Sequence, residues 1–150
     1  MGEEKIIAKA VILGVLVDWG GTLLATLVLG VALGVVMAVQ GNYSPSYMEK
    51  AIIFPSLVIG FGFTLLGGYI AGRTARQAHL LHGALVGAIG LLLSLLLYLF
   101  RPSLYASFPL WYNVLSFAGI IPIAMAGGHL AGRRAKRNEC AGQSGSTGCG

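Results

Sequence analysis

The chain has 150 residues, of which 56% are hydrophobic and only 10% are charged, and its formal net charge is +5. So few polar side chains cannot cover the surface of a soluble globule, so the composition excludes a water-soluble domain and predicts an integral membrane protein. The positive charge lies at the ends of apolar segments, which argues for orientation in a membrane and against a nucleic-acid partner.

Four apolar segments follow one another along the chain, and each is long enough to cross a bilayer. A helix rises about 1.5 Å per residue, so about 20 residues span a hydrocarbon core of about 30 Å. We expect helices over residues 6–39, 46–75, 80–100 and 109–132. The sequence therefore predicts an all-α integral membrane four-helix bundle over residues 1–137. A disordered cytoplasmic tail rich in Gly, Ser and Thr is expected over 138–150.

One motif occurs twice, as Gly-Gly-Tyr-Ile-Ala-Gly-Arg over residues 67–73 and as Gly-Gly-His-Leu-Ala-Gly-Arg over residues 127–133. Each copy ends an apolar run, so we interpret the bundle as two duplicated helical hairpins. Small residues spaced by four let membrane helices approach closely. The glycines expected at helix contacts on this ground are Gly60, Gly68, Gly72, Gly83, Gly87, Gly128 and Gly132.

The distribution of Lys and Arg predicts the orientation. With the N-terminus inside, Lys5, Lys9 and six further cations lie on the cytoplasmic side, whereas Lys50 and Arg101 lie outside. This bias predicts a multi-pass protein of the cytoplasmic (inner) membrane with both termini cytoplasmic. We expect the six further cations to contact anionic lipid headgroups. They are Arg73, Arg76, Arg133, Arg134, Lys136 and Arg137.

Asp18 is the only acidic residue within the apolar segments, and Thr22 and Thr26 follow it at four-residue steps. An aspartate at the centre of a membrane helix costs roughly 2.5 to 3.5 kcal/mol, so it should face the bundle rather than lipid. Two interpretations stay open. A structural Asp18, protonated or hydrogen-bonded by Thr22 and backbone groups, would hold helices together. A functional one would bind a proton, cation or cationic solute between the hairpins.

The sequence predicts no enzyme, because nucleophile, phosphate-loop and metalloprotease motifs are all missing from it. His79 and His82 are three residues apart but have no third ligand nearby in the sequence, so we expect interfacial residues and no metal site. Nothing in the sequence points to a cofactor.

The segments Leu-Val-Asp-Trp-Gly-Gly-Thr, Gly-Gly-Tyr-Ile-Ala-Gly-Arg and His-Gly-Ala-Leu-Val-Gly together resemble a group of small, uncharacterised four-helix membrane proteins of prokaryotes. This resemblance implies the fold and the membrane location but no activity. Partners are expected to be membrane lipids and either further copies of the chain or a larger membrane complex. We therefore expect a structural or accessory subunit or a homo-oligomeric scaffold; the alternative is a small transporter or channel that uses Asp18.

Overall fold

A computed structural model describes residues 7–41, 45–75, 78–106 and 108–143, nearly all of which are helical. The helices are α1 (Ala8–Gln40), α2 (Pro45–Ala75), α3 (His79–Phe100), α4 (Pro102–Ala106) and α5 (Leu110–Gln143). All of them except α4 are long and apolar enough to cross a membrane. The predicted all-α four-helix membrane bundle is confirmed.

Two parts of the chain differ from the sequence prediction. Helix α5 continues through residues 138–143, so the tail predicted as disordered begins as helix; residues 144–150 lie outside the described part. Ala135, Lys136, Arg137 and Glu139 are good helix formers, which explains why the helix continues after its apolar part ends. The other difference is the short helix α4 between α3 and α5, which the apolar pattern did not predict because it is only five residues long.

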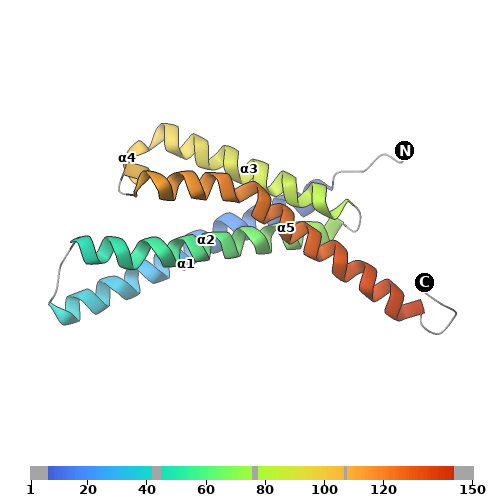
Figure 1. Cartoon of the computed structure of the whole chain (residues 1–150), viewed down its shortest axis with the longest axis horizontal. Coiled ribbons are helices and arrows are strands. Elements are labelled where there is room, and N and C mark those ends of the chain that lie inside the picture. The colour runs from blue at the N-terminus through green and yellow to red at the C-terminus, as the bar shows by residue number, and fades with distance from the viewer. Residues whose placement is uncertain (1–6, 42–44, 76–77, 107, 144–150) are drawn as a thin grey trace.

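The long helices form two hairpins, α1 with α2 and α3 with α5 (Figure 1). The hairpins meet mainly through α2 and α5, and they diverge towards the connections α1–α2 and α3–α5. The start of α1 and the end of α5 lie at the same end of the bundle (Figure 1). We call this the glycine-packed end, which holds Ala8, Ala75 and His79, and the opposite end, which holds Gln40 and Phe100, the open end. Pro122 lies inside α5, which changes direction part-way along its length (Figure 1).

The core lies at the glycine-packed end, where backbones touch. A Cβ atom added to Gly68 would collide with the backbone carbonyl of Ala124, and one added to Gly83 would lie 2.6 Å from the same oxygen. Gly14 fits equally closely against Gly67 of α2, because a Cβ on Gly14 would lie 2.7 Å from that carbonyl oxygen. Glycine is therefore needed here for helix approach rather than for backbone conformation.

Most of the glycines expected at helix contacts lie at close approaches. Hypothetical Cβ atoms on Gly72 and Gly87 would lie within 3.1 Å of α5, and those on Gly128 and Gly132 would meet His79 at the start of α3. Gly60 is the exception, since nothing lies within 4 Å of such an atom. The contact predicted at Gly60 is wrong because the neighbouring Phe61 meets α5 at that level, where its ring lies 2.7 Å from the position that a Cβ on Gly119 would take.

Two histidines fasten the turn between α2 and α3. His79 Nδ1 donates to the carbonyl oxygen of Gly72 at 2.6 Å, in the last turn of α2. His82 is fully buried, and its Nε2 accepts a hydrogen bond from the backbone N–H of Ile7 at 3.1 Å. Its Nδ1 therefore carries the proton and donates to the carbonyl of Ala78 at 3.0 Å. The expectation that His82 is an interfacial residue is wrong, because the ring caps the start of α1 inside the core.

Aromatic rings close the connection between α3 and α5 at the open end. Tyr105 of α4 stacks on Phe117 and meets Tyr98 edge-on, with ring centroids 5.9 and 5.4 Å apart. Burial raises the pKa of the Tyr105 phenol, which keeps the hydroxyl protonated. This hydroxyl donates to the carbonyl of Ser94 at 3.3 Å, so α4 is held against α3.

Candidate binding site at Asp18

The candidate site forms where three helices reach the same depth. Asp18 is ten residues into α1, Thr64 is eleven residues before the end of α2 and Gly90 is eleven residues into α3. At about 1.5 Å per residue, all three lie about 15 Å from the glycine-packed end, near the middle of a bilayer. Residues far apart in sequence thus share one level of the bundle.

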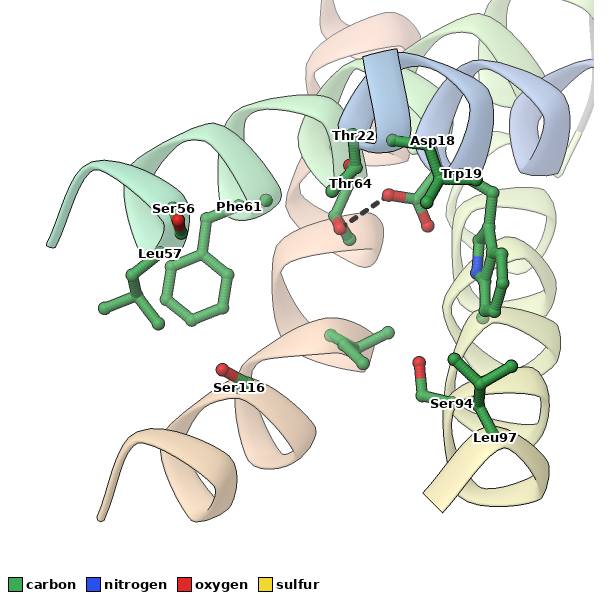
Figure 2. Close-up of a pocket in the computed structure, with 14 residues that line it drawn as sticks. Asp18, Trp19, Thr22, Ser56, Leu57, Phe61, Thr64, Ser94, Leu97 and Ser116 are labelled. Atoms are coloured by element: carbon green, nitrogen blue, oxygen red, sulfur yellow. Dashed lines mark hydrogen bonds between the residues drawn. The ribbon is translucent and has the colours of Figure 1, made fainter. Parts of the chain in front are cut away.

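The Asp18 carboxyl is held by one hydroxyl on a neighbouring helix. The Thr64 hydroxyl donates to Asp18 Oδ1 at 2.7 Å, and each of the two residues is only 5% exposed (Figure 2). The second oxygen, Oδ2, lies 3.2 Å from the position that a Cβ on Gly90 would take. A side chain at Gly90 would therefore crowd this oxygen, so the glycine keeps room for the carboxyl group.

A cavity of about 230 Å³ extends from Asp18 between all four long helices. Hydroxyl groups contributed by all four long helices surround it, and Figure 2 shows Thr64 beside the carboxyl and Ser94 across the space below it. The ring of Trp19 and the ring of Phe61 supply apolar walls. The further lining residues are Thr22, Leu23, Ser56, Leu57, Gly60, Gly90, Leu97, Ser116 and Ile120.

The cavity lies on the open-end side of the glycine contacts. Ser56 precedes Thr64 along α2 and Ser94 follows Gly90 along α3, so both lie nearer the open end than Asp18 does. Towards the other end, α2 and α5 touch at Gly68 and at Gly127, where a Cβ would collide with the carbonyl of Leu65. The cavity is therefore bounded by packed backbone on one side only.

Of the two threonines predicted to accompany Asp18, only one reaches the cavity. Thr22 lines the cavity, whereas Thr26 does not; its hydroxyl donates to the Thr22 carbonyl at 2.7 Å within the same helix. Thr64, which was not among the predicted site residues, is the direct partner of Asp18. Sequence reasoning had expected Thr22 or backbone groups in that role. Only the register between α1 and α2 identifies the right threonine.

The basic residues expected to contact lipid headgroups lie at the glycine-packed end. Arg73 is exposed near the end of α2, and Arg133, Arg134, Lys136 and Arg137 are exposed on α5. Arg76 lies outside the described residues. Helix α5 continues beyond the end of α2 at this end of the bundle (Figure 1).

The function of this site cannot be transferred from known proteins. Comparisons with protein-family models, with curated proteins and with solved structures find no match to the chain. The geometry of the four helices and the cavity at Asp18 is therefore the basis for inferring what the protein does.

Proposed function

We propose that the protein is a small multi-pass membrane transporter or channel in which Asp18 binds a small cationic solute, an inorganic cation or a proton. The observation that carries this proposal is the cavity at the Asp18 carboxyl. An aspartate that served only to join helices would be surrounded by partners, whereas Asp18 has Thr64 on one oxygen and the cavity beside it.

The chemistry of the cavity favours a small cation. A carboxyl group provides the charge, the hydroxyls of Thr22, Ser56, Ser94 and Ser116 provide oxygen ligands, and Trp19 offers the face of an indole ring, which attracts cations. The volume of about 230 Å³ is below the range of about 300 to 1,000 Å³ typical of drug-sized ligands. The occupant we expect is an inorganic cation or an ammonium ion of a few heavy atoms.

Reconstituted protein tests this proposal directly. Proteoliposomes on a solid-supported membrane should give a current after a concentration jump of sodium or methylammonium ions, or after a pH jump. Asp18→Asn keeps an acceptor for Thr64 but removes the ionisable group, so it should abolish the current while the helical content stays unchanged. Thr26→Val is the matched control, because Thr26 lies outside the cavity.

Two results would refute this function. A parent protein that carries no current with any of the three ions would remove transport, and an Asp18→Asn variant with the parent's current would remove the role of the carboxyl. A Thr22→Val variant refines the picture, since the loss of one cavity hydroxyl should weaken the apparent affinity for the ion without abolishing the current.

A second candidate function is that of a structural or accessory subunit or a homo-oligomeric scaffold, and the surface of α1 favours it. In the most apolar stretch of α1 only 6% of the residues are buried, against 22% in each of the other three long helices. Nothing lies within 4 Å of a hypothetical Cβ on Gly30 or on Gly34, four residues further on. This spacing is typical of a helix that packs closely on another.

Native mass spectrometry of the detergent-purified protein tests this second function. We expect a defined oligomer or a larger complex that Gly30→Leu and Gly34→Leu disrupt, because leucine would keep the backbones apart. Gly62→Leu is the control, since Gly62 also has open space around it but belongs to α2. A monomeric parent protein would exclude the homo-oligomer and leave Asp18 as the functional feature.

The proposed location is the cytoplasmic (inner) membrane with both termini on the cytoplasmic side. The support is the distribution of Lys and Arg in the sequence, because eight of them fall on the cytoplasmic side and two outside when the N-terminus is inside. Cysteine labelling tests it: with Cys140 and Cys149 replaced by Ser, an exposed Ser103→Cys probe in α4 should react with an impermeant reagent in intact cells. If Ser103→Cys reacted only after permeabilisation, the orientation in the membrane would be the opposite of the one proposed.

A further inference from the structure

A second pocket, of about 560 Å³, lies between α2 and α5 at the glycine-packed end. It is lined by Tyr69 of α2 and by Leu130, Arg133, Arg134 and Arg137 of α5. We call it the arginine pocket. The four residues of α5 follow one another at steps of three, one and three, so they occupy one face of the helix. That face is turned towards Tyr69, which is half-buried.

The arginine pocket has the chemistry of a phosphate site. Three guanidinium groups converge on it, and none of its described lining residues is acidic. A guanidinium matches the geometry of phosphate oxygens with two parallel hydrogen bonds, and a phenol adds a further donor. A group with several charged oxygens is thus the ligand that this set of donors fits best.

The position of the pocket decides between a lipid and a soluble phosphate. Tyr69 and Leu130 lie near the ends of the candidate membrane spans Ala51–Ala75 and Leu110–Arg137, and the three arginines follow Leu130 in the last turns of the second span. Arginines at the end of a membrane helix extend their charged groups into the headgroup region. Leu130 is 45% exposed and forms an apolar wall beside the cations. A free phosphate gains nothing from such a wall, whereas a phospholipid places its glycerol and acyl chains against it.

We propose that the arginine pocket binds the headgroup of an anionic phospholipid, with its phosphate between Arg133, Arg134 and Arg137 and its glycerol region beside Leu130. This site is distinct from the Asp18 cavity, which lies at least one helical turn further into the membrane. It therefore stands or falls independently of the proposed transport function. Lys136, which is exposed on the same helix, is not among the lining residues and takes no part.

Lipid binding to the full chain in an uncharged detergent tests this site. Titration with phosphatidylglycerol, followed by native mass spectrometry, should give saturable binding of one lipid, while phosphatidylcholine with the same acyl chains binds much more weakly. Arg133→Gln and Arg137→Gln should each weaken phosphatidylglycerol binding about fivefold. Lys136→Gln, which removes the same charge outside the pocket, should weaken it less than about twofold.

Several outcomes would overturn the proposal. Equal losses for Lys136→Gln and Arg133→Gln would mean diffuse attraction to a charged surface rather than a site. Equal binding of phosphatidylcholine would remove the requirement for an anionic headgroup. Displacement of phosphatidylglycerol by inorganic phosphate in large excess would assign the pocket to a soluble phosphate instead. Because the arginines are exposed, we expect their replacement to leave the fold intact, and thermal unfolding of each variant checks this point.

Discussion

The two halves of helix α2 use one sequence pattern for opposite purposes. Ser56, Gly60, Thr64, Gly68 and Gly72 recur at four-residue steps, yet the first three line the cavity and the last two pack against α5. A four-residue row drifts by about 40° per step around a helix of 3.6 residues per turn, so a single neighbour meets only part of it. Small residues at four-residue spacing therefore indicate a helix face without bulky side chains. The position at which the helices cross decides whether that face packs against a neighbour or lines a cavity.

The sharpest test of this comparison replaces one glycine from each half of the row by alanine. At Gly68 the new methyl group would collide with the Ala124 carbonyl, and backbone cannot rotate away as a side chain does. We expect Gly68→Ala to lower the free energy of unfolding by about 1 to 3 kcal/mol. Gly60→Ala meets nothing within 4 Å and should leave it nearly unchanged or slightly raised. Thermal or denaturant unfolding in detergent, followed by circular dichroism, measures both; equal effects would contradict the division of α2.

The hydrogen bond from Thr64, in the cavity-lining half of α2, to Asp18 of α1 has a smaller expected effect. A double-mutant cycle with Asp18→Leu and Thr64→Val isolates the hydrogen bond between these two side chains. We expect a coupling free energy of about 1 kcal/mol, since hydrogen bonds between membrane helices average about 0.6 and reach about 1.7 kcal/mol. Unfolding of the parent, the two single variants and the double variant gives the value. Additive single effects would mean that Thr64 does not hold the carboxyl group.

The smallest expected effect concerns the turn that joins α2 to α3 at the packed end. Ala78 has φ of 48°, in the left-handed region that residues with a Cβ rarely adopt. Ala78→Gly should therefore raise the free energy of unfolding, by about 0.5 to 1 kcal/mol. Ala88→Gly, in the regular part of α3, should lower it by a similar amount, because glycine weakens a helix interior. A loss of stability at both positions would show that Ala78 is not strained.

Much of the fold follows from the sequence because the length of an apolar run is a local property. Seven of the eight ends of the four long helices were predicted within two residues. Asp18 was selected as a candidate because a charged side chain inside a membrane helix is costly and usually serves a function. The end of α5 was missed because polar residues were read as disorder, although Lys136 and Glu139 favour helix as well as solvent.

The composition of the cavity could not be predicted in the same way. Whether Thr22 or Thr64 meets Asp18 depends on how α1 and α2 slide past each other, and no single segment carries that information. The same holds for His82, whose burial depends on the backbone of Ile7, 75 residues away. Cavities and caps between helices are properties of register, which a four-residue pattern leaves undetermined.

That hydrogen bond from Ile7 to His82 also bears on how the protein is made. A chain is synthesised from its N-terminus, so α1 enters the membrane before α3 exists. The first turn of α1 then lacks the ring that accepts its backbone N–H, and it acquires this partner only once the third helix has inserted. The start of α1 is thus fully hydrogen-bonded only after His82 has been synthesised and inserted. A ribosome-bound chain that stops before residue 82 should therefore leave the start of α1 accessible to proteases.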